Sequence, residues 1–447
     1  MQKTVNIVGA GLAGSEAALQ LADRGVRVRL FEMRPQVATA VHKGSGCAEL
    51  VCSNSLKSMK PDSAAGMLKA ELSALGSQVL ACAHLTQVDA GGALAVDRDL
   101  FSAEVTRRVE SHPNISLFRQ EVTCAPDQDC DAVIIASGPL TSDALAQWLS
   151  TCTGMDNLAF YDAAAPVVMA DSLDMSVLFR QSRYEQDSVG DYLNAPFTKE
   201  SYDRFIQELL GAQRVIAKDF ETKDLFSACQ PIEEIARKGA DAPRFGTCKP
   251  VGLIDPATGR RPWAAVQLRA ENRECTAYNL VGFQTNLTFP EQRRVFRMIP
   301  GLENAQFARY GVMHRNTFVC APKILDRTLR VTSAPTAVPL YLAGQVSGTE
   351  GYCEAIASGL VAALSVFAHL QGEDMPEYPR TTAFGSLLAY ATDPQTVDYQ
   401  PMHVNFGIIA PLDQQIKNKG QRYAAYCARG SAHMDQFCQS LRERGIL

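Results

Sequence analysis

Motifs that would assign this sequence to a metal-binding or disulfide-rich class are missing. Thirteen cysteines are scattered along 447 residues, yet no two of them are spaced as C-x-x-C and none stands near histidine at zinc-ligand spacing. A disulfide scaffold is not expected in a chain of this length. The thiols are instead typical of small hydrophobic side chains in a reducing compartment. We therefore expect a cytoplasmic protein without a metal site.

Long hydrophobic runs are also missing. The most apolar stretch, residues 355–370, is interrupted by polar residues such as Ser358 and His369. It is shorter than the roughly 20 apolar residues that a membrane-spanning helix needs, so we expect a buried helix. No charged-then-apolar leader typical of a secretory signal begins the sequence. These absences predict a protein with no membrane partner.

A strong charge of one sign is missing as well. The formal net charge is −5, which disfavours a protein that binds nucleic acid through its whole surface. Charge is uneven, however, because residues 290–330 contain eight basic and three acidic side chains. Arg294 and Arg297 would share one face of a helix there and could contact RNA phosphates. The alternative is a solvated face with internal ion pairs.

What the sequence does contain is a glycine-rich turn inside a complete strand–helix–strand unit. Residues 4–8 predict a strand, residues 15–24 a helix and residues 26–31 a second strand. The turn carries the pattern G-x-G-x-x-G, formed by Gly9, Gly11 and Gly14. Such a pattern between a strand and a helix is typical of a dinucleotide-binding Rossmann unit.

Each residue of this motif has a physical role. Gly9 permits the tight turn, Gly11 lets backbone N–H groups approach a pyrophosphate, and Gly14 lets the helix pack on the strand. Glu32 ends the second strand, and its carboxylate can accept both ribose hydroxyls of an adenosine. Met33 and Arg34 follow it and are assigned to the same cofactor site.

FAD is favoured over a nicotinamide dinucleotide as the bound cofactor. Glu32 would repel the 2′-phosphate of NADP, and no second G-x-G-x-x-G occurs. Near the C-terminus, residues 339–343 predict a strand, followed by a glycine-rich turn and a helix of small residues. This unit resembles the one that flavoproteins place against the pyrophosphate and the isoalloxazine. The cofactor contacts predicted there are Gly344, Gln345, Gly348, Gly351 and Tyr352.

Between these two units the sequence changes character. Residues 132–136 predict another buried strand, and residues 142–149 a helix. Beyond them the alternation of strand and helix stops, and only a helix at residues 199–215 is distinct. We expect an α/β fold: a Rossmann-like FAD-binding domain of the two-dinucleotide-binding flavoprotein type with an inserted α+β domain. The predicted division is 1–165, 166–321 and 322–447, the first and last parts forming the FAD-binding domain.

Nine segments together resemble one enzyme family nearly from end to end. They are GAGLAGSEAALQLA, ELVCSNSLKS, AVDRDLFS, YDAAAPVV, KPVGLIDPATGR, VQLRAEN, YNLVGFQTNLTFPEQRRVFRMIPGLENAQFARYGVMHRNTF, AGQVSGTEGYCEAIASGL and QPMHVNFG. In this order they resemble the folate- and FAD-dependent tRNA uracil-5-methyltransferases. The resemblance is more specific than the FAD motif alone.

The resemblance implies a reaction. The family reduces FAD with NADH or NADPH and takes a methylene from methylenetetrahydrofolate onto flavin N5. That carbon passes to C5 of a uridine in the T-loop of tRNA and is then reduced to methyl by a flavin hydride. Because uracil C5 is a poor nucleophile, this chemistry needs a thiolate that adds to C6 and a base for the C5 proton.

Two cysteines are candidates for catalysis. Cys52 precedes Ser53, Asn54 and Ser55, which predict a helix start that would lower its pKa together with nearby lysines. By resemblance, Cys229 attacks uracil C6 and Cys52 acts near the flavin, although the two roles could be exchanged. The family pattern before Cys229 has Glu-Gly where this chain has Ser-Ala. An alternative for either thiol is a buried side chain without a reactive role.

The remaining assignments come from the resemblance too. It implies that His314 stacks on the folate pterin, that Tyr352 lies against flavin or folate, and that Arg315 joins the RNA-binding residues. Glu233 and Glu234 are expected to pair with Arg237 and Lys238 at helical spacing.

Three other functions stay open at this point. One is the same chemistry on a uridine of ribosomal RNA. Another is a small-molecule FAD oxidoreductase, which would not bind RNA or need both cysteines. The third is an RNA-binding flavoprotein without catalysis, which would tolerate the loss of Cys229. The sequence does not predict the oligomeric state.

Overall fold

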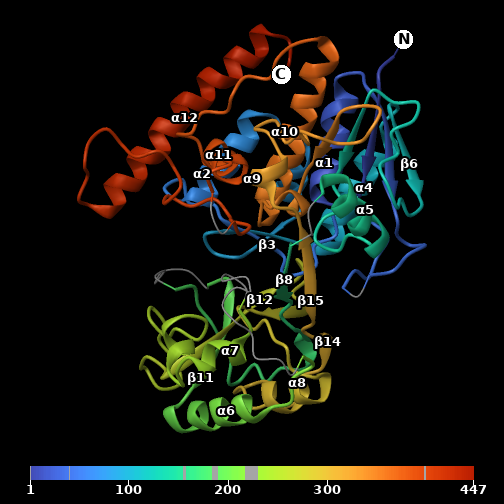
Figure 1. Ribbon diagram of the computed structural model, residues 1–447. Coiled ribbons are helices and arrows are strands. Elements are labelled where there is room, and N and C mark those ends of the chain that lie inside the picture. The colour runs from blue at the N-terminus through green and yellow to red at the C-terminus, as the bar shows by residue number, and fades with distance from the viewer. Residues whose placement is uncertain (1, 40, 155–157, 184–189, 217–229, 397–398) are drawn as a thin grey trace.

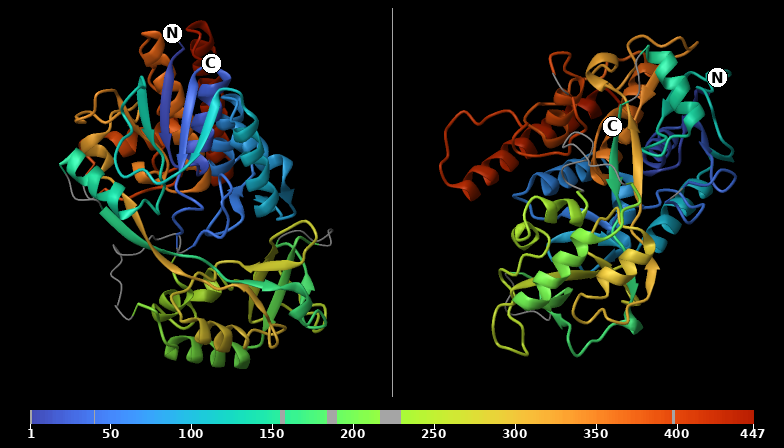
Figure 2. Two further views of the ribbon diagram at one scale, coloured as in Figure 1. Left: turned by 90° about the vertical axis from the view of Figure 1, so that its right-hand side faces the viewer. Right: turned by 60° about the horizontal axis from the view of Figure 1, so that its bottom comes forward.

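The computed structural model describes residues 2–39, 41–154, 158–183, 190–216, 230–396 and 399–447. They form two lobes, and both ends of the chain lie in the larger one (Figure 1). The middle of the sequence makes the smaller lobe. The two lobes are joined by an antiparallel ribbon of β8 (Leu158–Ala163) and β15 (Met313–Phe318), which Figure 2 shows from two further sides.

The larger lobe is built on a parallel sheet of five strands, in the order β16-β7-β1-β2-β6. Their bounds are Leu340–Leu342 for β16, Ala132–Ile135 for β7, Thr4–Val8 for β1, Arg27–Glu32 for β2 and Ile115–Arg119 for β6. All residues of β1, β7 and β16 are buried, as expected for strands covered on both faces. The strands predicted near residues 4–8, 26–31, 132–136 and 339–343 are therefore confirmed.

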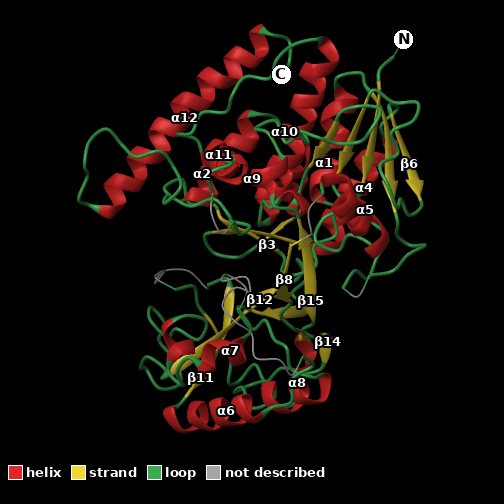
Figure 3. Ribbon diagram, in the orientation of Figure 1, coloured by secondary structure: helices red, strands yellow, loops and turns green. Residues whose placement is uncertain are grey.

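Helices cover this sheet and extend beyond it (Figure 3). Their bounds are Leu12–Asp23 for α1, Ala64–Ala74 for α2, Gln78–Leu85 for α3, Arg98–Ser111 for α4, Asp143–Thr153 for α5, Ala321–Ile324 for α9, Tyr352–Gln371 for α10, Ala383–Thr392 for α11 and Lys419–Glu443 for α12. Helices α1 and α10 cross closely, because a Cβ on Gly359 would lie 2.2 Å from the Ala13 carbonyl oxygen. By length and composition α10 is the one helix among the described residues that could cross a membrane, yet most of it is buried inside the protein. The predicted buried helix is thus confirmed.

The smaller lobe has its own sheet and hydrophobic core. Six strands lie in the order β10-β11-β12-β13-β9-β14, and all paired neighbours are antiparallel. The strands are β9 (Val167–Met169), β10 (Phe179–Arg180), β11 (Tyr192–Phe197), β12 (Ala264–Ala270), β13 (Ala277–Leu280) and β14 (Phe307–Arg309), and the helices are α6 (Lys199–Gly211), α7 (Ile232–Arg237) and α8 (Phe289–Phe296). The predicted helix at 199–215 ends early, at Gly211, and Arg214 instead forms a bridge with Leu287. The boundaries at 166 and 322 remain a prediction.

One local prediction about the Cys52 segment was wrong. Residues 53–55 do not begin a helix, because Ser55–Ser58 forms the strand β3. It pairs with β5 (Ala93–Val96), which also pairs with β4 (Gln87–Val88). The side chain of Asn54, which would have capped a helix, instead donates to the carbonyls of Val96 and Ala270 at 3.0 and 2.9 Å. Cys52 therefore does not lie at a helix N-terminus.

Candidate active site

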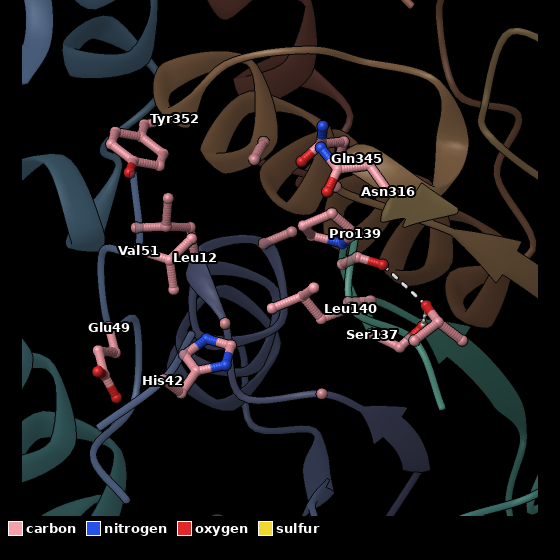
Figure 4. Close-up of a pocket in the computed structure, with 18 of the residues that line it drawn as sticks. Leu12, His42, Glu49, Val51, Ser137, Pro139, Leu140, Asn316, Gln345 and Tyr352 are labelled. Atoms are coloured by element: carbon pink, nitrogen blue, oxygen red, sulfur yellow. Dashed lines mark hydrogen bonds between the residues drawn. The ribbon is translucent and has the colours of Figure 1, made fainter. Parts of the chain in front are cut away.

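A cavity of about 350 Å³ opens where the strands of the parallel sheet end, a common position and size for a cofactor site. Figure 4 shows Tyr352 and Val51 on one side, Gln345 and Asn316 on another, and His42 and Glu49 at a third position. The predicted cofactor residues that line it are Gly9, Gly11, Glu32, Met33, Arg34, Gly344, Gln345, Gly351 and Tyr352. The structure thus brings together residues from opposite ends of the sequence.

Gly14 and Gly348, also predicted to contact the cofactor, are not among the lining residues. A Cβ on Gly14 would stand 1.8 Å from the Gly9 carbonyl oxygen, so its place is in the packing of α1 on the turn. A Cβ on Gly348 would stand 2.0 Å from the Tyr399 hydroxyl, which donates to the Gly348 carbonyl at 2.8 Å. Both glycines shape the backbone behind the cavity.

Two helices begin at the cavity without a capping side chain. Gly11 is the N-cap of α1 and Gly351 the N-cap of α10, and neither helix has a side-chain hydrogen bond at its cap. Their first N–H groups and helix dipoles therefore favour a negatively charged ligand. No atom lies within 4 Å of the place of a Cβ on Gly11. This geometry fits the pyrophosphate of a dinucleotide.

Glu32 stands at the cavity inside a buried ion-pair network. Its carboxylate accepts from the Ala10 N–H at 2.9 Å and from the Arg34 guanidinium at 2.9 Å. Arg34 also pairs with Glu49 at 2.8 Å. Burial would raise the pKa of Glu32, but Arg34 and the N–H donors hold that pKa below its ordinary value. The carboxylate is thus ionised and fixed, as an acceptor of ribose hydroxyls must be.

Replacing Glu32 by alanine is expected to weaken flavin binding about tenfold or more, because a charge-assisted hydrogen bond to the ribose is lost. Arg34 keeps Glu49 as a partner, so the protein should still fold. The flavin-to-protein absorbance ratio after gel filtration measures the effect. Glu49→Gln, which disturbs the same network without the predicted ribose contact, is the matched control. A fully yellow Glu32→Ala protein would refute the ribose assignment.

Cys52 lines the same cavity and is partly buried. The Tyr352 hydroxyl oxygen accepts from two consecutive N–H groups, those of Cys52 at 2.9 Å and Ser53 at 3.2 Å. The Cys52 thiol lies 3.7 Å from the Ala163 carbonyl oxygen, on the ribbon that joins the lobes. The thiol therefore lies at the junction of the two lobes, beside Tyr352 at the start of α10.

Arginines hold the carbonyl groups just before Cys52. Arg98 donates to the Leu50 carbonyl at 2.8 Å, and Arg309 donates to the Val51 carbonyl at 3.2 Å. Arg98 also forms a 2.5 Å ion pair with Glu271 of the smaller lobe. Sequence reasoning did not assign these residues, although AVDRDLFS and VQLRAEN contain two of them. The groups that these side chains contact lie far away in sequence, so only the folded chain shows them.

Asn54 completes this frame on the other side of Cys52. It is fully buried, and its side-chain oxygen accepts from the Arg269 guanidinium at 2.7 Å. Arg269 belongs to β12 of the smaller lobe. The polar residues around Cys52 therefore form hydrogen bonds to both lobes and not a helix cap.

Replacing Tyr352 by phenylalanine is expected to reduce turnover about tenfold while flavin stays bound. The change leaves the Cys52 and Ser53 N–H groups without their acceptor and loosens the thiol by a fraction of an ångström. Steady-state methylation rates at saturating substrates measure it. Tyr399→Phe removes another buried hydroxyl, one that donates to the Gly348 carbonyl, and serves as the control. Unchanged turnover in Tyr352→Phe would contradict this positioning role.

Acidic groups gather at the same end of the cavity. Glu350 and Asp162 both line it, and the Gln345 amide donates to Glu350. Burial raises the pKa of Glu350 well above its ordinary value, and the charge of Asp162 raises it further. Nearby, the Lys57 ammonium lies 3.6 Å from the buried Glu354 carboxylate. The backbone of Lys57 has a φ of 66°, a conformation that lysine rarely adopts. The cavity thus contains a carboxyl group whose pKa is raised by burial and by a neighbouring carboxylate.

The structure does not describe the side chains of three predicted site residues. Cys229 lies outside the described residues. The backbone of His314 and Arg315 is described, in β15, where they pair with Asp162 and Tyr161 of β8. His314 is thereby placed opposite a cavity-lining residue, but the side chains of His314 and Arg315 are not described. Their assigned roles stay predictions.

The predicted RNA-binding arginines of the smaller lobe are engaged by protein groups. Arg294 pairs with Glu291 at 2.8 Å and also with Glu208. Arg297 donates to the Ala305 carbonyl at 3.0 Å. The alternative of internal ion pairs therefore describes Arg294 well, and an RNA role for either residue stays a prediction.

The pairing predicted for Glu233 was wrong, whereas Glu234 does pair with Arg237, at 3.5 Å. Glu233 is fully buried and accepts from the Thr285 hydroxyl at 3.0 Å and the Asn286 N–H at 2.6 Å. Burial raises its pKa to about 7. The side chain faces the core, where it supports the loop after β13.

Among the described residues, no group of three or more His, Cys, Asp or Glu is placed to hold a metal.

Comparison with known proteins agrees with this geometry. A family model described as Glucose inhibited division protein A matches residues 4–374. The methylenetetrahydrofolate–tRNA-(uracil-5-)-methyltransferase TrmFO of Geobacter sulfurreducens is 52% identical over 98% of this chain and 99% of its own length. The chain belongs to the TrmFO family. TrmFO of Moorella thermoacetica is 50% identical over 96% of this chain and 97% of its own, and TrmFO of Bacillus pumilus 47% identical over 99% and 100%.

Solved structures show the same fold at much lower identity. Two crystal forms of Aquifex aeolicus GidA each superpose with a TM-score of 0.68 and 16% identity. The superpositions cover 98% and 99% of this chain, and 74% and 79% of the two GidA chains. The likeness confirms the predicted Rossmann-like flavoprotein fold with an inserted domain. The two TrmFO relatives from Geobacter sulfurreducens and Bacillus pumilus, in contrast, match over at least 98% of this chain and at least 99% of their own length.

Proposed function

We propose that this protein methylates C5 of a T-loop uridine in tRNA. Methylenetetrahydrofolate is the carbon donor, FAD the cofactor, and NADH or NADPH the reductant, in the cytoplasm. The observation that carries the proposal is the placement of Cys52 at a dinucleotide-type cavity by groups from both lobes. The full-length similarity to TrmFO proteins supports the same reaction.

The residues at the cavity fit FAD. The uncapped N-termini of α1 and α10 would hold its phosphates, and Glu32 its adenosine ribose. Gln345, Gly351 and Tyr352 would lie along the remaining part of the cavity. When bound, FAD supplies the transfer of the one-carbon unit and the hydride that completes the methyl group. The chain itself binds, orients and moves protons.

A thiolate makes the uracil reactive. Addition of a cysteine sulfur to C6 forms an S–C6 bond and places electron density on C5, which then attacks the one-carbon unit. Loss of the C5 proton to a base and cleavage of the S–C6 bond regenerate the thiolate and the aromatic base. We assign the addition to Cys229 and place Cys52 next to the flavin. The hydrogen bonds that Tyr352, Arg98 and Arg309 form with the backbone of residues 50–52 position it there.

Two groups at the cavity can hold a proton at neutral pH. Burial raises the pKa of Tyr352 far above its ordinary value, so its hydroxyl accepts from two N–H groups and keeps its own proton. Burial and the charge of Asp162 also raise the pKa of the Glu350 carboxyl, which favours its protonated form. Glu350 is therefore placed to donate a proton to a ligand in the cavity, whereas the C5 deprotonation step needs a separate, unprotonated base.

The test is a direct assay. The purified protein is incubated with methylenetetrahydrofolate, NADH or NADPH and an unmodified tRNA transcript, with a ribosomal RNA fragment in parallel. Mass spectrometry of the digested RNA then measures 5-methyluridine, which is expected on tRNA alone. Methylation of the ribosomal fragment alone would move the target and keep the mechanism. A flavin-bound protein that methylates neither RNA would refute the proposal.

A further inference from the structure

Residues 404–429 form an element that no part of the reaction above uses. It consists of the loop at 404–418 and the first eleven residues of α12, and we call it the basic arm. The buried residues of α12 are Gly430, Met434, Phe437, Cys438 and Leu441, all in its second part, which packs against α2. The first part projects away from the larger lobe (Figures 1 and 3).

The basic arm has the opposite charge from the protein as a whole. It contains the four basic residues Lys417, Lys419, Arg422 and Arg429 and the one acidic residue Asp413, whereas the net charge of the chain is −5. Aromatic rings lie among the cations: Phe406 stacks on Tyr423 at 4.1 Å, and the Lys419 ammonium lies 5.4 Å from the Tyr423 ring. Cations interleaved with aromatic rings are typical of surfaces that bind single-stranded nucleic acid.

The arginines and the lysines of the arm differ in what they contact. Arg422 donates to the Ile416 carbonyl at 3.2 Å and Arg429 to the Pro411 carbonyl at 2.6 Å, so both fasten the loop to the helix. Lys417 and Lys419 are exposed and form no ion pair with any carboxylate in the described part of the chain. The arm thus presents two lysines to solvent while its arginines bind its own loop.

The base of the arm is attached to the active site. Thr349 forms a bridge with Met402, and the Glu350 N–H donates to the Met402 carbonyl at 3.1 Å. The Val404 N–H donates to the Glu354 carboxylate at 3.2 Å. Because Glu350 lines the cavity, the segment that leads into the arm lies directly against the active-site turn. A polymer whose reacting base enters the cavity would therefore have neighbouring residues within reach of the arm.

We propose that the basic arm docks the sugar–phosphate backbone of the substrate RNA, with Lys417 and Lys419 as phosphate contacts. The inference rests on the proposed function and names a surface for it. It also accounts for RNA binding by a protein whose predicted contacts, Arg294 and Arg297, are engaged by Glu291, Glu208 and the Ala305 carbonyl. Charge complementarity is the physical basis, since each lysine that meets a phosphate releases a counterion.

The double variant Lys417→Glu/Lys419→Glu tests this. Glutamate suits the first turn of a helix, so α12 should still form. The expected result is a dissociation constant for an unmodified tRNA transcript raised about tenfold or more, and a salt dependence of log Kd whose slope is lower by about two. Flavin content and NAD(P)H oxidation without RNA should stay at wild-type values.

Arg27→Glu/Arg204→Glu is the matched control, because it makes the same charge change at two exposed residues away from the arm. Equal weakening by both double variants, or unchanged tRNA binding in the arm variant, would overturn the proposal. Loss of binding to phosphatidylglycerol vesicles with normal tRNA binding would assign the arm to a membrane surface and overturn it as well. Wild-type protein that methylates no RNA would instead refute the proposed function.

Discussion

Replacing Cys52 by alanine is expected to abolish methyl transfer, by at least about a thousandfold, while the flavin stays bound. The frame around Cys52 consists of hydrogen bonds to main-chain groups, from Arg98 to the Leu50 carbonyl and from Cys52 N–H to Tyr352. Alanine keeps these groups, so only the sulfur is removed. Mass spectrometry of 5-methyluridine measures the turnover, and the absorbance spectrum reports the flavin.

Cys47→Ala is the matched control for this experiment. Cys47 lies in the same segment but is fully buried, and burial raises the pKa of its thiol. Its loss should cost stability and leave turnover per folded, flavin-bound protein near the wild-type rate. Turnover retained in Cys52→Ala would make Cys52 a structural thiol. The same loss is predicted for Cys229→Ala, from the family resemblance alone.

Replacing Gly14 by alanine is expected to destabilise the larger lobe by at least about 3 kcal/mol and to give protein without flavin. The new Cβ would stand 1.8 Å from the Gly9 carbonyl oxygen, so α1 must move off the turn. Because the obstacle is a backbone carbonyl group, no side chain can give way. Urea unfolding, followed by far-ultraviolet circular dichroism, measures the change.

Gly11→Ala in the same motif is the control with the opposite expectation. Its Cβ would meet no protein atom within 4 Å, and its φ of −72° is open to any residue. The variant should unfold like wild type yet bind flavin more weakly, since the methyl group enters the space that a pyrophosphate approaches. Equal stability of Gly14→Ala and Gly11→Ala would contradict the packing role of Gly14.

The elements of the larger lobe were predictable because their signals are local. A run of apolar residues followed by glycine and a small-residue helix predicts β1 at its observed bounds. It also predicts α1, although the observed helix begins three residues earlier than predicted, and the same reasoning found β7 and β16. The order in which these strands assemble is a property of the fold class that the motif indicates. Nine predicted cofactor residues therefore line one cavity.

The segment around Cys52 shows where local reasoning failed. Serine and asparagine cap helices, but they also hydrogen-bond distant backbone groups, and no local signal separates these uses. Asn54 bonds Ala270 and Arg269 from the smaller lobe, more than two hundred residues away in sequence. For the same reason Glu233 faces Thr285 and Asn286 and not the neighbouring arginine.

By itself, the sequence determined the cofactor class, the inserted domain and the two candidate cysteines, since these depend on residue types at short spacings or on family resemblance. Only the tertiary structure decided how Cys52 is held, which carboxyl at the cavity has a raised pKa, and which lysines remain exposed. Each of these depends on burial and on partners far apart in the chain. The pairs are Arg98 with Glu271, Glu350 with Asp162, and Val404 at the base of the arm with Glu354 of α10. Burial and long-range pairing arise only when the two lobes pack together, so no short stretch of sequence encodes them.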